Sequence, residues 1–269
     1  MTAASARAVL VGGHECGGHA GIVEPGRRLQ QAVECGLAGE PVVVVVPMTF
    51  GRDPAMMADA AKTLQGLAQR HPGRVALAAP FGTPDHLVAL LRGAARRAGD
   101  LGDRGGPAGL IVAARASNPF DDAELHRLAH LVRAHGAGIE VEVALLRDDV
   151  DVLTAHDRLR RLGVARSVVV PAGFGPGPAL PGDDALCAGL TADGPLLSET
   201  AIARVVAARV DTARHVLVDH RDDGIAAGLV ADHEHGYAHT HTHTHEDAGA
   251  PAEQEGHGHA QAALRARRW

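Results

Sequence analysis

The sequence predicts an α/β protein of two similar halves, each an open parallel sheet with helices on both faces, followed by a disordered tail. Two observations lead to this fold class. Short β-branched runs alternate with longer amphipathic stretches, which is the pattern of a parallel sheet covered by helices. The same order of elements then recurs further along the chain. With 269 residues and 46% hydrophobic side chains, the chain can bury such a core.

Short apolar runs are predicted to form the strands. The run of valines at residues 41–46 is typical of a parallel strand buried on both faces. The predicted strands cover residues 8–11, 41–46, 75–78, 110–112, 139–145 and 167–170.

Amphipathic stretches between these runs are predicted to form helices. Asp53 can cap the first of them, and Pro54 suits its first turn. Gly136 is a typical helix stop. The predicted helices cover residues 53–69, 84–98, 121–135, 149–162 and 198–213.

A degenerate internal repeat defines the halves. Residues 45–51 (VVPMTFG) match residues 169–175 (VVPAGFG), because in both an apolar run leads into Pro and then Phe-Gly. A Gly-rich, charged segment at residues 100–107 reads as a linker between the copies. We therefore expect halves at residues 1–104 and 105–218, with a histidine-rich disordered tail at residues 219–269.

Composition argues against several classes of protein. The net charge of −6 attracts neither nucleic acid nor an anionic membrane, and 2% aromatic residues offer few stacking platforms for bases. The longest apolar runs are far shorter than the roughly 20 residues that span a bilayer. No charged start followed by a long apolar region indicates a signal peptide, and none of the three cysteines forms a CxxC pair. We expect a cytoplasmic protein that binds neither nucleic acid nor membrane.

Common catalytic and cofactor motifs are missing from the sequence. There is no GxGxxG after the first strand and no GxxxxGK[ST], so we expect no bound nucleotide. There is no GxSxG elbow, which disfavours an ordinary serine hydrolase.

The tail contains an alternating HTHTHTH segment. Imidazoles on a flexible chain can wrap Zn, Ni, Co or Cu ions, so the tail is predicted to bind divalent transition metals. The alternative is a solubilising tail with incidental metal affinity. The histidines of this segment are His239, His241, His243 and His245.

His14 is the main candidate for a site in the folded part. It follows the first predicted strand directly after Gly12 and Gly13, and ligands of open parallel sheets bind beyond the carboxyl ends of strands. The glycines would let a substrate approach the backbone closely. Asp53 follows the second strand, where a helix cap and a metal ligand are compatible roles. The alternative for His14 is an ordinary exposed loop histidine.

The remaining histidines of the folded part read as surface residues. His19 lies in a Gly-rich loop, and His86 lies near a helix start. The others have helical spacing on charged stretches, which is typical of solvated helix faces; they are His126, His130, His135 and His156.

These features together resemble the class II chelatases of tetrapyrrole biosynthesis, and most of all the sirohydrochlorin cobaltochelatases. Residues 10–14 (LVGGH) resemble the family's Gly-His-Gly after its first strand. Residues 117–119 (SNP), followed by residues 123–126 (AELH), are similar to its Ser-Arg-Asp-Pro segment and the helix after it. Residues 159–171 resemble its helix-to-strand passage. Long members also carry a histidine-rich segment.

The resemblance implies two α/β halves facing each other across a cleft that binds a tetrapyrrole, here sirohydrochlorin. It implies insertion of Co²⁺ as a substrate without ATP, and the ligands do not discriminate against Ni²⁺ or Fe²⁺. His14 matches the histidine that binds the metal or accepts pyrrole protons. Arg52 and Arg115, both after strands, are candidates to hold the carboxylates of the macrocycle in forked hydrogen bonds. A monomer would suffice, since one chain supplies both halves.

Departures from the family pattern leave alternatives open. The second half has Ala-Ala-Arg at residues 113–115 where a second Gly-His-Gly would stand. Either one site survives with His14 and Asp53, which would favour harder ions, or the activity has been lost. In the second case the chain is a non-catalytic cobalt or nickel carrier built on a degenerate chelatase fold. A third reading is an unrelated α/β enzyme with an unimportant tail.

Overall fold

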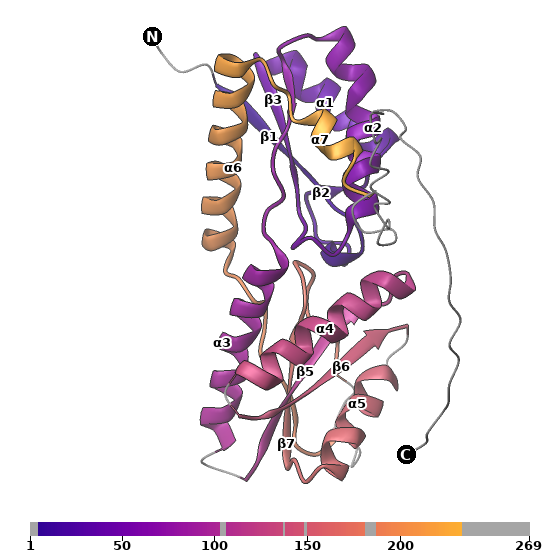
Figure 1. Cartoon of the computed structure of the whole chain (residues 1–269), viewed down its shortest axis with the longest axis vertical. Helices are drawn as coiled ribbons and strands as arrows, with labels where there is room; N and C mark the ends of the chain where they lie inside the picture. Colours follow the sequence, from indigo (N-terminus) through magenta and orange to yellow (C-terminus); the bar gives the residue numbers. More distant parts are fainter. Residues whose placement is uncertain (1–4, 103–105, 137, 148–149, 181–186, 233–269) are drawn as a thin grey trace, which may run out of the picture. The chain divides into compact units, whose positions relative to one another are not determined.

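The computed structural model describes residues 5–102, 106–136, 138–147, 150–180 and 187–232 (Figure 1). Within these residues the chain forms two four-stranded sheets in which every strand pair is parallel, with helices packed against them. The predicted fold class of two similar parallel-sheet halves is therefore confirmed. No helix in these ranges is both long and apolar enough to cross a bilayer.

The first sheet has the strand order β2-β1-β3-β4. All six residues of β3 are buried, because the valine run packs helices on both of its faces. Val43 and Val45 face α1 and α2, whereas Val44 and Val46 belong to the core cluster that includes α6. The strands are β1 (Ala6–Val11), β2 (Ile22–Val23), β3 (Val42–Pro47) and β4 (Val75–Leu77).

The second sheet repeats this order as β6-β5-β7-β8. Its registers match as well, since Val11 pairs with Pro47 in the first sheet and Ala113 pairs with Pro171 in the second. The internal repeat therefore corresponds to a repeated topology. The strands are β5 (Ala108–Arg115), β6 (Glu140–Leu146), β7 (Arg166–Pro171) and β8 (Leu190–Ala192).

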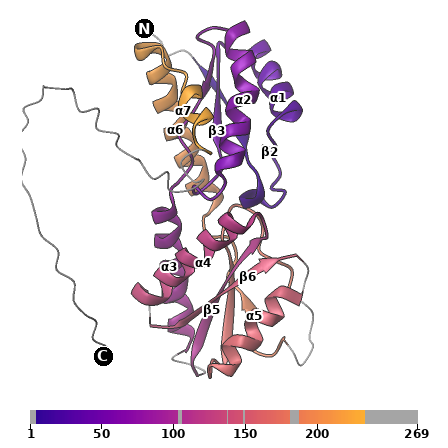
Figure 2. The same cartoon turned by 45° about the vertical axis from the view of Figure 1, so that its right-hand side comes forward.

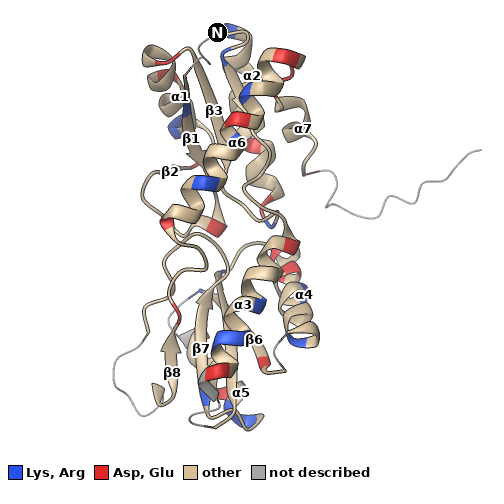
Figure 3. Ribbon diagram, turned by 90° about the vertical axis from the view of Figure 1, so that its left-hand side faces the viewer, with Lys and Arg blue, Asp and Glu red and all other residues tan. Residues whose placement is uncertain are grey.

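Each helix that the sequence predicted is present. The side chain of Asp53 accepts a hydrogen bond from the Met56 N–H at 3.1 Å, so it caps α2 as expected. Charged side chains lie mainly on helices and loops, and the strands carry few of them (Figure 3). The helices are α1 (Arg27–Gly39), α2 (Pro54–Arg70), α3 (Pro84–Gly102), α4 (Pro119–His135), α5 (Val150–Arg161), α6 (Glu199–His220) and α7 (Ile225–Leu229).

Some short or weakly marked elements were not predicted. The helix α1 begins after Gly26 without a side-chain cap, so its start carries no sequence signal. Strands β2 and β8 have only two and three residues and are defined by their pairing with β1 and β7. Residues 219–232, which the sequence assigned to the tail, include α7, and Ile225 in α7 is part of the core beneath the first sheet.

Two helices pack across the halves of the sequence. The helix α3 follows the first sheet in the chain but packs against β5 and β7 of the second. The helix α6 follows the second sheet but packs against β1, β3 and β4 of the first (Figures 1 and 2). Each sheet is thus covered on one face by a helix from the other part of the chain, which joins the two sheets into one compact unit.

The two copies of the repeated Pro-x-x-Phe-Gly phrase meet each other. Phe50 follows β3 and Phe174 follows β7, and their rings stack with centroids 4.8 Å apart and planes 2° from parallel. Phe81 packs edge-on against both rings. The Phe174 N–H donates to the Glu15 carbonyl at 2.8 Å. A Cβ at Gly173 would lie 2.2 Å from that same carbonyl, so only glycine fits there.

His156 is buried, and its predicted place on a solvated helix face was wrong. Its side chain is 1% exposed and lies between α5 and β7. One ring nitrogen, Nδ1, lies 2.9 Å from Ser167 Oγ, and the other, Nε2, lies 3.3 Å from the Ala188 carbonyl. Burial lowers the pKa of His156 below its usual 6.5. His126, His130 and His135 are exposed, as predicted.

We expect His156 to make the protein less stable in mild acid. A histidine whose pKa is depressed by folding contributes stability that is present above the unfolded pKa of 6.5 and is lost as pH falls toward the folded value. The free energy of unfolding in urea, measured from pH 7 to pH 5, should therefore fall less steeply in His156→Gln than in the parent. His130→Gln, at an exposed position, should keep the parental slope. Equal slopes in all three proteins would contradict the assignment.

Candidate metal centre

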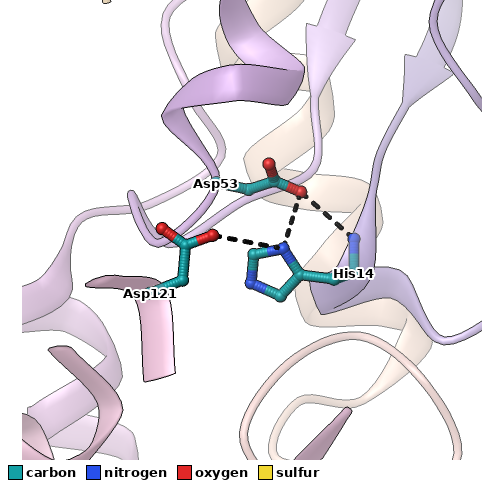
Figure 4. A group of neighbouring side chains, drawn as sticks. All are labelled: His14, Asp53 and Asp121. Atoms are coloured by element: carbon teal, nitrogen blue, oxygen red, sulfur yellow. Dashed lines mark hydrogen bonds and ion pairs between the residues drawn. The ribbon is translucent and has the colours of Figure 1, made fainter. Parts of the chain in front are cut away.

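The candidate site lies where the carboxyl ends of the two sheets meet. His14 begins the short 3-10 helix η1 (His14–Cys16) after β1, Asp53 lies after β3, and Asp121 lies in the first turn of α4 after β5 (Figure 4). In the first sheet β2 pairs with one edge of β1, and the chain then crosses over to form β3 on the other edge. In the second sheet β6 and β7 flank β5 in the same way. This change of direction between β1 and β3, and between β5 and β7, is where parallel sheets bind ligands.

The imidazole of His14 lies between two carboxylates. Its Nδ1 is 3.0 Å from Asp53 Oδ2 and 3.9 Å from Asp121 Oδ2. The backbone N–H of His14 also donates to Asp53 Oδ2, at 3.1 Å. The three side chains are only 11%, 9% and 8% exposed. The other ring nitrogen, Nε2, is buried and has no hydrogen-bond partner among the described residues.

Neighbouring residues fix both carboxylates. A Cβ at Gly13 would lie 2.1 Å from Asp53 Oδ2, so this glycine makes room for the aspartate rather than for a substrate. Gly12 makes room for the side chain of Cys16 in the same way. On the other side, Ser117 Oγ and Asn118 Nδ2 donate to Asp121 Oδ2 at 3.0 and 2.6 Å.

The charges of the three groups are interdependent. Burial by itself lowers the pKa of His14, but the hydrogen bond and the negative charge of Asp53 outweigh it and raise that pKa above 6.5. Burial raises the pKa of Asp53, but His14 and two backbone N–H groups hold it below 3.8. Burial raises the pKa of Asp121 above 3.8, and the hydrogen bond from Ser117 offsets only part of this. Asp53 is therefore the ionised anchor of the imidazole.

Glu15 and Arg52 form a second, deeper layer. Glu15 is 4% exposed and accepts hydrogen bonds from the Thr49 hydroxyl, the Phe50 N–H and the Arg52 N–H. Arg52 is 1% exposed, and its Nη1 donates to the Ala172 carbonyl at 3.3 Å. Its Nε and Nη2 have no partner among the described residues. The predicted cleft arginine is thus buried against the loop that follows β7.

Arg115 occupies a different position from Arg52. It is exposed and lines a cavity of about 210 Å³ together with His14. The ends of β5 and β7 and the loop after β7 form the walls of this cavity. Pockets that enclose whole small ligands usually measure about 300–1,000 Å³, so this one fits a substituent of a larger molecule. Larger hollows elsewhere on the described surface are not lined by His14, Asp53 or Asp121.

The geometry does not suit two common kinds of nucleophilic catalysis. Ser117 Oγ and Asp53 Oδ2 both contact Nδ1 of His14, whereas a Ser-His-Asp relay needs them on opposite ring nitrogens. Burial raises the pKa of the Cys16 thiol to about 12, and its Sγ donates to the Met48 carbonyl. Neither side chain is an activated nucleophile.

His14 and Asp53 were predicted from the sequence as site residues, whereas Asp121 and Glu15 were not. In the sequence Asp121 is only an acidic residue near the start of a predicted helix. No local pattern around it indicates that this helix, α4, begins beside the ends of β1 and β3. The matched registers place Ala116 at the position equivalent to His14 and Gly177 at the position equivalent to Asp53. The second half therefore contributes to the centre through Asp121. The predicted tail ligands His239, His241, His243 and His245 lie outside the described residues.

The chain matches no family model and no curated protein sequence. Among solved structures it is similar to SirB from Bacillus subtilis with Fe³⁺, with 14% identity and a TM-score of 0.44, over 81% of this chain and 99% of that one. It is also similar to DR2241 from Deinococcus radiodurans, which is described as having structural similarity to chelatases. There the identity is 20% and the TM-score 0.34, over 77% of this chain and 54% of that one. Neither similarity identifies a metal or a substrate for this chain.

Proposed function

We propose that this protein inserts a divalent metal ion into a tetrapyrrole, and specifically Co²⁺ into sirohydrochlorin. The observation that carries the proposal is the environment of His14. Its Nδ1 is anchored by Asp53, and its buried Nε2 has no partner in the described part of the chain, at the meeting point of two parallel sheets. The sequence resemblance at residues 10–14 and 117–126 to class II chelatases supports the same reaction.

The chemistry of insertion matches what an anchored imidazole can do. The reaction must remove two pyrrole N–H protons while the metal arrives at the ring nitrogens. A histidine with a pKa near neutrality accepts protons efficiently, and a carboxylate on one ring nitrogen fixes the ring and increases the basicity of the other. Asp53 supplies this carboxylate. The metal ion is a substrate, which the centre must hold and then release.

Arg115 is proposed to bind a carboxylate of the macrocycle. It is exposed on the wall of the cavity that His14 also lines, and a guanidinium binds carboxylates through paired hydrogen bonds. The volume of about 210 Å³ fits one edge of a tetrapyrrole, so the rest of the ring would lie outside the cavity. Arg52 can reach a substrate only if its hydrogen bond to the Ala172 carbonyl breaks. We therefore propose that Arg52 binds a carboxylate of the macrocycle only after this hydrogen bond has broken.

The histidines of the tail are proposed to capture metal ions and raise their concentration near the folded part. Imidazole and carboxylate ligands accept Co²⁺, Ni²⁺ and Fe²⁺, so the choice of Co²⁺ rests on the resemblance alone. One observation favours the alternative of a non-catalytic carrier. Ala116 occupies the position equivalent to His14, so only one half carries a histidine for the reaction.

The test is a visible-absorbance assay with the full chain, sirohydrochlorin and Co²⁺, repeated with Ni²⁺ and Fe²⁺. We expect a spectral change faster than in the enzyme-free control. A tail variant with the eight histidines between residues 233 and 259 changed to Ala should insert metal at high concentration but load it less well when metal is scarce. Substitution is preferable to truncation after residue 219, because Ile225 is part of the core. Metal binding without any acceleration over the control would favour the carrier.

A further inference from the structure

We infer that Asp121 is the third ligand of a divalent-cation centre that it forms with His14 and Asp53, so that the centre takes ligands from both sheets. The inference deepens the proposed function and rests on it for its role, since the bound ion would be the metal awaiting insertion. Asp121 comes from the sheet that lacks the matching histidine, and it compensates for that loss.

The spacing of the three groups suits one small cation. One potential ligand atom from each residue lies within 4.8 Å of the other two. The bonds from Co²⁺, Fe²⁺ or Zn²⁺ to nitrogen and oxygen are about 2.0–2.2 Å long, so neighbouring ligand atoms stand roughly 3 Å apart and opposite ones roughly 4 Å. His14 Nδ1 lies 3.0 and 3.9 Å from the two Oδ2 atoms, which is within this range. A bound ion would take the place of the proton between Nδ1 and Asp53, so the imidazole would accept a pyrrole proton only after the ion has left.

A bound cation would balance the buried carboxylates of the region. Glu15, Asp53 and Asp121 are all buried carboxylic acids, and Arg52 is the buried cation that acts on Glu15 and Asp121. Around a bound metal ion, with the three acids ionised and His14 neutral, the side chains of these residues and Arg52 would together carry two negative charges. Removing unbalanced charge from water is costly, and a divalent ion would neutralise the excess.

A buried, unpartnered polar group beside the carboxylates supports this independently. Arg52 is only 1% exposed, and its Nε and Nη2 lack hydrogen-bond partners in the described part of the chain. The side chain lies close enough to lower the pKa of both His14 and Asp121. These donors need acceptor oxygens, and water molecules on a bound ion would supply them.

Both carboxylates are held in the orientation that a ligand needs. Asp53 Oδ1 accepts from the Met56 N–H, which leaves Oδ2 directed at His14. Asp121 Oδ2 is held by Ser117 and Asn118 from the turn before α4. Such outer hydrogen bonds orient ligands in metal sites and commonly affect affinity about 10–100-fold. One imidazole and two carboxylates also favour Co²⁺, Fe²⁺ or Mn²⁺ over the soft Cu⁺, unlike the tail, which offers imidazoles.

The test uses Co²⁺ alone and the full chain in which all eight tail histidines are Ala, so that only the folded part binds. Isothermal titration should give one site per chain, and Asp121→Asn should weaken it at least about 10-fold. Asp85→Asn is the matched control, because it removes one charge from the first turn of another helix, at an exposed position. Thermal unfolding without metal checks that each variant folds, and Asp121→Glu, which keeps the charge, should retain more affinity than Asp121→Asn.

The outcomes separate this inference from the proposed function. The parent here is the chain without tail histidines. If the parent and Asp121→Asn bind Co²⁺ with equal affinity, or if the parent shows no single site, Asp121 is not a metal ligand. If Asp121→Asn does not fold, X-ray absorption on the Co²⁺-loaded parent tests the ligand set instead. We expect one imidazole and carboxylate oxygens around the ion, and several imidazoles would refute the assignment. A parent that binds Co²⁺ through Asp121 but inserts no metal would refute the chelatase and leave the metal centre intact.

Discussion

Changing His14 to Ala is expected to slow metal insertion by about 10²–10⁴-fold, the usual contribution of a positioned acid–base group. The variant loses both a metal ligand and the acceptor for pyrrole protons, and the buried surroundings admit little water to replace them. The measurement is the initial rate of the absorbance change with sirohydrochlorin and Co²⁺. His130→Ala, at an exposed position on α4, should keep the parental rate.

The same variant distinguishes the enzyme from the carrier. If the protein is a carrier whose tail stores metal, His14→Ala should leave the total metal bound per full-length chain almost unchanged. If it is a chelatase, turnover should collapse even though the tail still binds metal. A His14→Ala protein that folds and inserts metal at more than half the parental rate would exclude the proposed role of this residue.

Changing Glu15 to Ala is expected to lower the free energy of unfolding by about 3–5 kcal/mol, because it leaves several buried hydrogen-bond donors without their acceptor at about 1–3 kcal/mol each. Glu15 is 4% exposed, so little water can reach the donors that it leaves behind. The substitution removes the acceptor of the Thr49 hydroxyl and of two backbone N–H groups. Glu15→Gln should cost less, because its amide oxygen still accepts hydrogen bonds.

Urea unfolding followed by circular dichroism measures this difference. Glu24→Ala is the matched control, because Glu24 is exposed and its contact with Arg28 is 4.0 Å long, so we expect a change within about 0.5 kcal/mol. The main-chain carbonyl of Glu15 still accepts from the Phe174 N–H in this variant, so the loss measures the side chain alone. A loss below about 1 kcal/mol would mean that the freed donors find other acceptors.

Local sequence patterns determined which segments became strands and helices. The valine run of β3 could only be a strand buried on both faces, and Asp53 followed by Pro54 set the start of α2. These features depend on neighbouring residues, so they can be read without knowing the fold. The position of His14 was predictable for the same reason, because the end of a parallel strand is a local feature with a known place at the sheet edge.

The tertiary structure alone decided which elements meet. Periodicity shows that a helix has a buried face but not which sheet covers it, so the exchange of α3 and α6 between sheets could not be predicted. For the same reason, His156 has the spacing of a solvated face and is nonetheless buried against β7. Asp121 stands 107 positions after His14 in the chain, and the two approach only because the carboxyl ends of both sheets converge. Charge and ligand geometry depend on such distant contacts, which act through space and leave no periodic pattern in the sequence.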